Sequence, residues 1–229
     1  MSPKAICLLS GGLDSATTLY AAKAKGYEVR ALTIHYGQLH ERELECAKKL
    51  AQGVAIEHQV MALSLPWKGS ALLDASIPVP TGRSDQEMAH GIPVTYVPAR
   101  NTIFLAVAAS YAEASGSAIL LIGANILDYS GYPDCRPEYF KSLEETLRLG
   151  TKAGAEGRRL SIEAPLLKLS KKEIIEWGMR LGVPYDKTWS CYQGQKAPCG
   201  ACDACQLRAK GFREAGHEDP LLNYEKSSH

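Results

Sequence analysis

The sequence has no long hydrophobic run, no recognisable leader and no excess of either charge. Its longest apolar stretches, residues 103–109 and 118–122, are far shorter than the roughly 20 residues that cross a membrane. A glycine-rich loop begins as early as Ser10, so we expect no secretory leader. Because 26 Lys and Arg oppose 25 Asp and Glu, the net charge is +1, and we expect neither a membrane nor a nucleic-acid partner.

The cysteine content does not fit a disulfide scaffold. The chain holds seven cysteines, an odd number, and its 229 residues are enough to bury a core without disulfides. A hydrophobic fraction of 45% is ordinary for a globular protein. We therefore predict a globular protein of a reducing compartment, the cytoplasm.

Strand-like and helix-like segments alternate along most of the chain. The expected strands are residues 4–9, 27–35, 56–63, 117–123 and 159–164. The expected helices are residues 13–25, 38–52, 101–114, 137–151, 170–181 and 203–215. The helix at 170 begins with the capping box Ser170-Lys171-Lys172-Glu173. This order predicts an α/β fold with a parallel sheet. A proline-rich connection over residues 64–98 interrupts the alternation, and its length is typical of lids and binding loops.

The first expected strand is followed by the segment Ser10-Gly11-Gly12-Leu13-Asp14-Ser15. Glycines let backbone N–H groups approach an anion, and the start of the next helix adds partial positive charge. Asp14 fits beside phosphates only if Mg²⁺ or backbone donors intervene. Neither G-x-x-x-x-G-K-[ST] nor G-x-G-x-x-G occurs. The segment therefore predicts a phosphate-binding loop, and its resemblance to the S-G-G-x-D-S signature of the PP-loop ATP pyrophosphatases implies an ATP site; the alternative is a tight turn capped by Asp14 or Ser10.

Four cysteines lie close together near the C-terminus, as C-x7-C-x2-C-x2-C: Cys191, Cys199, Cys202 and Cys205. Four thiolates at this spacing complete a closed tetrahedral site, so we predict one structural Zn²⁺ per chain. An iron–sulfur cluster and a redox pair are the alternatives. Cys7 and Cys46 are interpreted as small core residues. We predict a domain over residues 1–185 and a cysteine-rich region over residues 186–229.

Polar residues also follow later expected elements. Arg100 and Asn101 stand at the start of a helix, where the alternative is a capping Asn101 beside a solvated Arg100. Asp128 follows a buried strand, and a rigid segment with Tyr132, Asp134 and Arg136 comes after it; a plain turn is the alternative there. His35 ends the second strand and is interpreted as structural or as facing the nucleotide.

Together these motifs resemble the 7-cyano-7-deazaguanine synthases, the queuosine-pathway family of PP-loop ATP pyrophosphatases. The matching strings include residues 9–15, Tyr36-Gly37-Gln38, residues 97–101, residues 123–128, Tyr132-Pro133-Asp134-Cys135-Arg136, Lys168 and the cysteine-rich tail. His35 departs from the acid expected before Tyr36. The resemblance implies a parallel-sheet, adenine nucleotide alpha-hydrolase-like Rossmann-type sandwich with a small zinc-binding segment, and a homodimer.

The resemblance also implies an activity and a set of site residues. The family converts 7-carboxy-7-deazaguanine to a nitrile with ammonia and ATP, through adenylated carboxylate and amide. The implied ATP-binding residues are Leu9, Ser10, Gly11, Gly12, Leu13, Asp14, Ser15, Ala16, Thr17, Thr18 and Leu19, with Mg²⁺. The catalytic candidates are Asp14, Ser15, Arg100 and Lys168, the last two to neutralise developing charge. The substrate candidates are Asn101, Asp128, Tyr132, Asp134 and Arg136, with Asp128 or Asp134 on the guanine-like N–H edge and Tyr132 against its face.

Other functions stay open on the sequence alone. A PP-loop tRNA thiolase would need a basic surface and reactive cysteines, so the net charge of +1 disfavours it while Cys135 favours it. A PP-loop amidotransferase synthetase would need room for a glutaminase domain. A non-catalytic zinc-ribbon binding module would leave the ATP loop and the large α/β body unexplained.

Overall fold

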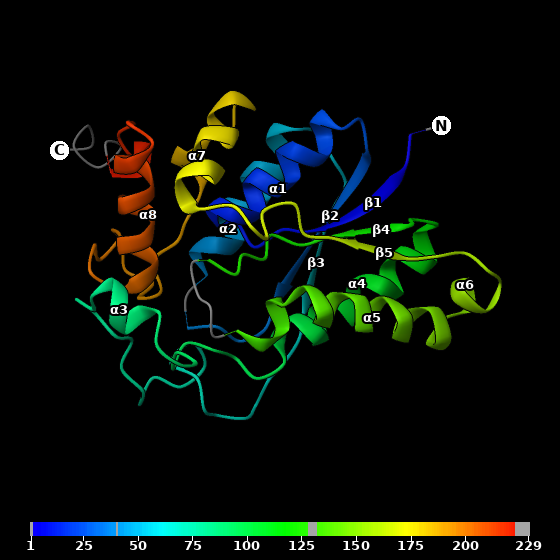
Figure 1. Ribbon diagram of the computed structural model, residues 1–229, viewed down its shortest axis with the longest axis horizontal. Helices are drawn as coiled ribbons and strands as arrows, with labels where there is room; N and C mark the ends of the chain where they lie inside the picture. Colours follow the sequence, from blue (N-terminus) through cyan, green and yellow to red (C-terminus); the bar gives the residue numbers. More distant parts are fainter. Residues whose placement is uncertain (1, 40, 128–131, 223–229) are drawn as a thin grey trace.

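The computed structural model describes residues 2–39, 41–127 and 132–222 (Figure 1). Five strands form one sheet in the order β3-β2-β1-β4-β5, and every neighbouring pair is parallel. The strands are β1 (Lys4–Leu8), β2 (Glu28–His35), β3 (His58–Ala62), β4 (Ile119–Leu121) and β5 (Ser161–Glu163). The predicted α/β class with a parallel sheet is therefore confirmed, and each expected strand is present with somewhat shorter bounds.

Helices cover both faces of this sheet (Figure 1). One layer contains α1 (Leu13–Ala24), α2 (Arg42–Gly53) and α7 (Lys171–Arg180), and the other contains α4 (Arg100–Ser115) and α5 (Pro137–Gly150). The remaining helical segments are α3 (Asp85–Met88), η1 (Pro133–Cys135), α6 (Lys152–Ala155), η2 (Tyr185–Lys187) and α8 (Asp203–Glu214). None of the helices in the described part of the chain is long and apolar enough to cross a membrane.

The alternation of side chains along β1 separates the two cores. Ala5 and Cys7 pack with α1, α2 and α7, whereas Ile6 and Leu8 pack with α4 and α5. Both faces of a parallel sheet are buried in this way, so β1 is apolar along nearly its whole length. Cys7 is fully buried, as expected for a small core residue. Cys46 is only half-buried and lies against the C-terminal cysteines.

The sequence analysis assigned capping residues to two helices, α7 and α4. The structure confirms the cap of α7 and shows a different cap at α4. At α7, Ser170 Oγ accepts from the Glu173 backbone N–H and the Glu173 carboxylate accepts from the Ser170 backbone N–H, which confirms the capping box. At α4 the N-cap is Ala99, in the left-handed region with φ of 53°, and no side chain caps it. The interpretation of Asn101 as N-cap is therefore wrong, because Asn101 already lies inside the first turn.

The connection over residues 64–98 is anchored on the C-terminal region. The Gly82 backbone N–H donates to the Ala201 carbonyl at 2.9 Å, and Thr81 forms an isolated antiparallel bridge with Cys202. Arg83 forms an ion pair with Asp203, at the first residue of α8. Figure 1 accordingly shows α3 beside the foot of α8. This long connection is part of the packed structure.

The C-terminal region shares its core with the body of the protein. Phe212 of α8 belongs to the same buried cluster as Ile174 and Ile175 of α7. The Trp189 backbone N–H donates to the Gly11 carbonyl at 3.0 Å, which ties the start of the cysteine-rich segment to the loop after β1. The division of the chain at residue 185 stays a prediction.

Candidate active site and metal site

A cavity of about 260 Å³ lies beyond the carboxyl ends of β1, β2 and β4. Open α/β sheets bind their ligands at this edge. Three regions line the cavity: the loop after β1, a wall formed by α2, α4 and the segment before η1, and the cysteine-rich tail. Segments that lie far apart in the sequence therefore line one cavity.

The loop after β1 presents polar groups around the Ser15 hydroxyl. Ser15 Oγ accepts from the backbone N–H groups of Ser10 and Gly11, each at 3.2 Å, and donates to the Gly12 carbonyl at 3.0 Å. The N-cap of α1 is Gly12, and no side chain caps this helix. The alternative of a turn capped by Asp14 or Ser10 is therefore wrong, and the start of α1 remains open toward the cavity.

Gly11 allows α2 to pack closely against this loop. Its φ of +92° lies in the region that favours glycine, and a Cβ there would stand 2.0 Å from the Glu43 carbonyl oxygen. Gly123, after β4, is also tight, since its Cβ would meet the Asp14 carbonyl carbon and the Ser15 nitrogen at 3.0 Å. The two glycines therefore allow α2 and the segment after β4 to pack against the loop after β1.

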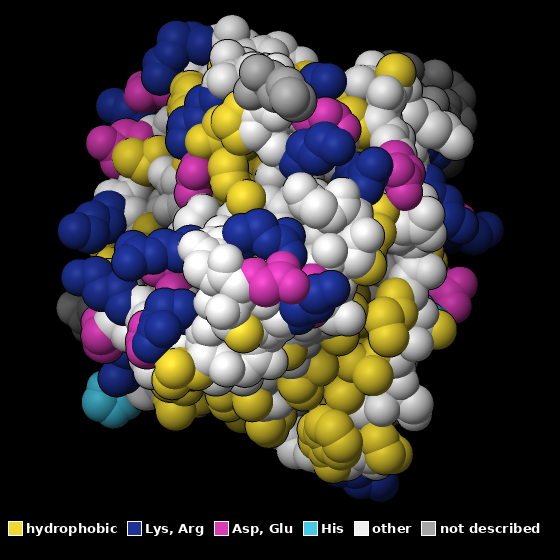
Figure 2. Space-filling view, turned by 90° about the vertical axis from the view of Figure 1, so that its right-hand side faces the viewer, with side chains coloured by type: hydrophobic (Ala, Val, Ile, Leu, Met, Phe, Trp, Pro, Cys, Tyr) yellow, Lys and Arg dark blue, Asp and Glu magenta, His cyan; other side chains and the backbone are white. Residues whose placement is uncertain are grey.

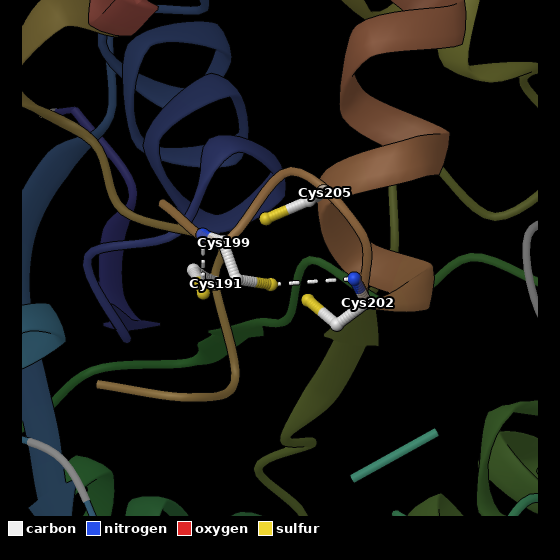
Figure 3. A group of neighbouring side chains, drawn as sticks. All are labelled: Cys191, Cys199, Cys202 and Cys205. Carbon is white, nitrogen blue, oxygen red and sulfur yellow. Dashed lines mark hydrogen bonds between the residues drawn. The ribbon is translucent and has the colours of Figure 1, made fainter. Parts of the chain in front are cut away.

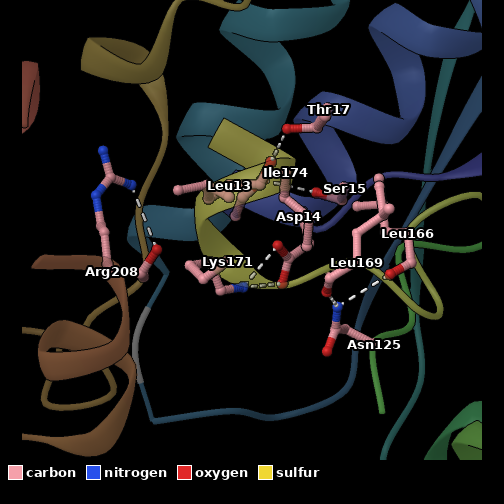
Figure 4. A network of polar contacts seen from close by, with 12 residues as sticks. Leu13, Asp14, Ser15, Thr17, Asn125, Leu166, Leu169, Lys171, Ile174 and Arg208 are labelled. Carbon is pink, nitrogen blue, oxygen red and sulfur yellow. Dashed lines mark hydrogen bonds and ion pairs between the residues drawn. The ribbon is translucent and has the colours of Figure 1, made fainter. Parts of the chain in front are cut away.

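Asp14 is paired with a lysine that the sequence analysis did not select. Lys171 Nζ lies 2.8 and 2.9 Å from the two carboxylate oxygens of Asp14, and both residues line the cavity (Figure 4). Lys171 is the first residue of α7, directly after the capping Ser170. Lys168, the expected charge-neutralising residue, is exposed and does not line the cavity. The capping box was the available signal, because it places Lys171 at a helix start.

The expected ATP-binding stretch is divided between cavity and core. Its cavity-lining members are Leu9, Ser10, Gly12, Leu13, Asp14 and Ser15. The buried members that do not line the cavity are Gly11, Ala16, Thr17, Thr18 and Leu19. Thr17 Oγ1 lies 2.8 Å from the Tyr185 hydroxyl, which explains its burial. Thr18 Oγ1 has no hydrogen-bond partner among the described residues.

Arg100 and Glu43 line the wall of the cavity opposite the loop after β1. Arg100 Nη1 donates to the Tyr36 hydroxyl at 3.3 Å, so the alternative of a solvated Arg100 is wrong. Glu43, in the first turn of α2, is half-buried, and burial raises the pKa of its carboxyl from 4.5 to about 7. The nearby Arg100 charge lowers that pKa without reversing the shift. The sequence analysis did not identify Glu43.

The expected substrate residues after Asp128 have different surroundings. Tyr132 lines the cavity, and its hydroxyl lies 3.2 Å from Thr95 Oγ1. Asp134 is buried outside the cavity lining, and its Oδ2 accepts from the Asn101 backbone N–H at 3.0 Å. Burial raises the pKa of Asp134, although that hydrogen bond opposes the shift. Arg136 is exposed and precedes α5.

Three further expectations have plain outcomes. Asn101 lines the cavity, and its side-chain amide donates to the Asp134 carbonyl at 3.2 Å and to Cys135 Sγ at 3.3 Å. Asp128 lies outside the described residues. His35 does not line the cavity, and its Nε2 is 3.8 Å from a Glu41 carboxylate oxygen.

The four C-terminal cysteines converge on one point (Figure 3). Their sulfur atoms all lie within 4.8 Å of one another. Backbone N–H groups of Gln193 and Cys199 donate to Cys191 Sγ at 3.5 and 3.3 Å, and that of Cys202 donates to Cys199 Sγ at 3.3 Å. Hydrogen bonds from neighbouring thiols and these N–H groups hold the pKa of Cys191 well below its ordinary value. The donor set fits a metal ion bound by four thiolates.

The metal site and the cavity are joined by the residues between them. Trp189 lines the cavity, and its indole N–H donates to the Cys191 carbonyl at 2.9 Å. Arg208 of α8 also lines the cavity and is buried in an ion pair with Asp219, with Nε to Oδ2 at 2.7 Å. A metal ion that orders this segment therefore also orders one wall of the cavity.

A comparison with known families decides the classification. Residues 4–216 match the family model described as queuosine biosynthesis protein QueC. The chain belongs to this family. The family suggested by the sequence motifs is thus confirmed over nearly the whole chain, and with it the assignment to an enzyme of queuosine biosynthesis.

Individual relatives agree with the family. The 7-cyano-7-deazaguanine synthase of Trichodesmium erythraeum is 54% identical over 96% of this chain and 100% of its own length. The 7-cyano-7-deazaguanine synthase of Thermoplasma acidophilum is 52% identical over 97% of this chain and 92% of its own. Among solved structures, NMN synthetase from Francisella tularensis aligns over 100% of this chain and 85% of its own, with 17% identity and a TM-score of 0.49.

Proposed function

We propose that the chain converts 7-carboxy-7-deazaguanine and ammonia to 7-cyano-7-deazaguanine with ATP. The observation that carries this proposal is a cavity in which the loop after β1 faces a wall of aromatic and ionisable side chains. Such a cavity suits a reaction between a nucleotide phosphate and a flat polar substrate. The confirmed family and the names of its relatives support the same reaction.

The reaction needs two activations because a carboxylate is a poor electrophile. The substrate carboxylate attacks the α-phosphate of ATP, which forms an acyl adenylate and releases pyrophosphate. Ammonia then adds to the carbonyl carbon, loses a proton and expels AMP, which leaves an amide. The amide oxygen attacks the α-phosphate of a second ATP, which releases pyrophosphate, and loss of AMP and of both remaining N–H protons forms the nitrile. Both carboxylate oxygens therefore leave on AMP.

The loop after β1 is our proposed site for the ATP phosphates. The backbone N–H groups of Ser10 and Gly11, which donate to Ser15 Oγ in the structure, and the hydroxyls of Ser10 and Ser15 would turn to the phosphates at the start of α1. Asp14 supplies a carboxylate that would hold Mg²⁺, which neutralises phosphate charge when bound. The buried residues Ala16 to Leu19 support the loop from the helix behind it.

Cationic side chains on two sides of the cavity are proposed to stabilise the developing negative charge. Lys171 takes the role expected of Lys168, because Lys171 lines the cavity beside Asp14 whereas Lys168 is exposed. Arg100 takes the same role from the opposite wall. Preorganised charges of this kind act on the transition state more strongly than on the ground state.

Mass spectrometry of one reaction mixture tests the proposal. It contains the purified protein, Mg-ATP, ammonium and 7-carboxy-7-deazaguanine, and AMP and pyrophosphate are followed alongside. A nitrile product that forms together with AMP is expected. ATP cleavage that responds to tRNA and ignores the deazaguanine would support a thiolase instead. Protein that turns over no nucleotide under either condition would favour the zinc-ribbon binding module.

A pair of lysine variants tests the phosphate side. Lys171→Met is expected to lower kcat by about 10²–10³-fold, since it removes a charge that faces the reacting phosphate. Lys172→Met is the matched control, because Lys172 is exposed on the same helix turn and pairs with Glu176 at 3.8 Å. Equal activity of the two variants would contradict the role of Lys171.

We further propose Zn²⁺ as the metal of the four-cysteine site. Four thiolates in a closed arrangement are the ligands that structural zinc prefers, and no open position for a substrate is needed. Metal analysis of the purified protein distinguishes zinc from iron, which an iron–sulfur cluster would contain.

A cytoplasmic homodimer is the proposed assembly. Support comes from the edge strand β3, where Val60 and Met61 are exposed, and from the exposed Trp67 that follows it. Figure 2 shows hydrophobic side chains gathered along the lower part of one face. Light scattering on the eluted protein measures its mass, and a monomer would contradict this assembly.

A further inference from the structure

The cavity contains two carboxylates among the described residues that line it, Asp14 and Glu43. They differ in their surroundings. Both oxygens of Asp14 are held by Lys171 Nζ, at 2.8 and 2.9 Å, beside the phosphate loop. The Glu43 carboxylate makes no hydrogen bond or ion pair with any described residue. Asp14 therefore belongs to the phosphate side of the cavity together with Lys171, whereas Glu43 has no described partner on its own side.

The surroundings of Glu43 make an ionised carboxylate without hydrogen-bond donors unfavourable in free energy. It is half-buried in the first turn of α2, and its backbone packs against Gly11. Desolvation of a carboxylate is unfavourable unless hydrogen-bond donors replace the lost water. The nearest cation, Arg100, is directed to the Tyr36 hydroxyl and ring, with its guanidinium 5.8 Å from the ring centroid. Within the described residues, no side chain or backbone N–H donates to the Glu43 oxygens.

The chemistry of the missing partner follows from these neighbours. Two carboxylate oxygens accept well from two parallel N–H donors. The positive charge of Arg100 in the same wall disfavours a small cation and leaves a neutral donor edge as the better match. Aromatic rings of Tyr36, Phe104 and Tyr132 line the same cavity and suit a flat heterocycle. A guanine-type base, with its ring N–H beside an exocyclic amino group, combines both properties.

Of the two acids expected from the sequence for this task, Asp128 lies outside the described residues and Asp134 has another partner. Asp134 accepts from the Asn101 backbone N–H at the start of α4 and does not line the cavity. Its carboxylate is therefore used to hold a helix end in place. Among the described acids, Glu43 is the one with free acceptors inside the cavity.

We propose that Glu43 recognises the guanine-type N–H edge of the deazapurine substrate and so determines the base specificity of the enzyme. This inference rests on the proposed substrate. Glu43 accepts from the ring N–H and from the 2-amino group, which directs the opposite side of the heterocycle, with its carboxyl group, away from α2. An analogue that lacks the 2-amino group leaves one Glu43 oxygen unsatisfied and binds more weakly.

Equilibrium binding tests this contact independently of turnover. Calorimetry measures the Kd of 7-carboxy-7-deazaguanine and of its 2-deamino analogue, each with a non-cleavable ATP analogue present. Wild-type protein is expected to bind the analogue about 10- to 100-fold more weakly, as for a lost hydrogen bond to a charged group. Glu43→Gln and Glu43→Ala are both expected to reduce this ratio to about 1–3.

The matched control is Glu45→Gln. Glu45 lies on the same helix, is exposed and does not line the cavity, so the variant is expected to keep the wild-type ratio. Glu43→Gln has the same shape as the native side chain and no charge to desolvate, so it is expected to fold. The Glu43→Ala variant gives a second measurement that does not depend on the geometry of glutamine.

The outcomes separate the inference from the proposed function. A ratio that stays at the wild-type value in both Glu43 variants would overturn the inference even if the nitrile is produced. A higher KM for ammonium with an unchanged Kd ratio would also overturn it and would make Glu43 an ammonium site. Wild-type protein that binds both compounds with the stated ratio but forms no nitrile would support the contact and contradict the proposed reaction.

Discussion

The two sides of the cavity differ in how their residues are distributed along the sequence. The phosphate-type side comes from one continuous stretch, residues 9–15, at the end of β1. The opposite wall comes from separate segments, with Tyr36 after β2, Glu43 in α2, Arg100 in α4 and Tyr132 before η1. The geometry of a continuous motif can be predicted from the sequence. A wall assembled from distant segments can be predicted only when the sheet order is known.

A change at the metal site is expected to have the largest effect, because the metal orders the cysteine-rich tail. This tail is the third region that lines the cavity. Cys202→Ser removes one of four thiolates and is expected to lose the metal and several kcal/mol of folding free energy. Metal content and chemical denaturation measure both. Cys46→Ser is the control, because Cys46 lies against the same cluster but is not one of the four cysteines. Equal metal content in the two variants would disprove the assignment of Cys202 as a ligand.

The close contact between the phosphate loop and α2 is tested by Gly11→Ala. The added Cβ would stand 2.0 Å from the Glu43 carbonyl at a φ of +92°, so we expect a loss of about 3 kcal/mol or more in unfolding free energy. Gly26→Ala is the control, with a φ of +79° and no atom within 4 Å, and is expected to cost about 1 kcal/mol. Similar losses for the two variants would show that the contact with α2 does not matter.

Glu43 predicts a dependence of stability on pH. Its folded-state pKa of about 7 exceeds the ordinary 4.5, so between these values the folded chain keeps a proton that the unfolded chain has released. The associated stability is present below pH 4.5 and is lost as pH rises through 7. Glu43→Gln removes this loss, so its advantage over wild type is expected to grow between pH 5 and 8, by on the order of 2 kcal/mol. Parallel stability curves for the two proteins would contradict the raised pKa.

The smallest effect is expected for Asp134→Asn, which tests whether Asp134 or Glu43 binds the substrate. Asp134→Asn keeps an oxygen that accepts from the Asn101 backbone N–H, so a change below about 1 kcal/mol in stability is expected. The Kd of the deazaguanine substrate is expected to stay within about twofold, in contrast to the Glu43 variants. A loss of substrate affinity comparable to that of Glu43→Gln would restore the role first expected of Asp134.

The parts of the site that the sequence predicted are those with local geometry. The strand–loop–helix context of Ser10 to Ser15 and the spacing of the four cysteines required no knowledge of the sheet order. The capping box at Ser170 is likewise local, and the structure confirms it. In each case, neighbouring residues in the chain supply most of the contacts that determine the conformation.

The parts that the sequence analysis missed depend on long-range packing. Lys171 meets Asp14 across 157 positions, and Asp134 meets Asn101 across 33. Glu43 looks like an ordinary surface acid of an amphipathic helix until the close packing at Gly11 brings its turn to the cavity. Asp134, in the rigid segment before α5, was a reasonable candidate, but its carboxylate accepts from the Asn101 backbone N–H at the start of α4.

Isotope tracing tests most directly whether the two sides of the cavity act on one substrate. The substrate is prepared with ¹⁸O in both carboxylate oxygens, and the products are examined by mass spectrometry after turnover with Mg-ATP and ammonium. If the carboxylate and then the amide are adenylated, every nitrile formed is accompanied by two AMP molecules that each carry one ¹⁸O. Label that appears in inorganic phosphate or in water, with unlabelled AMP, would contradict the account.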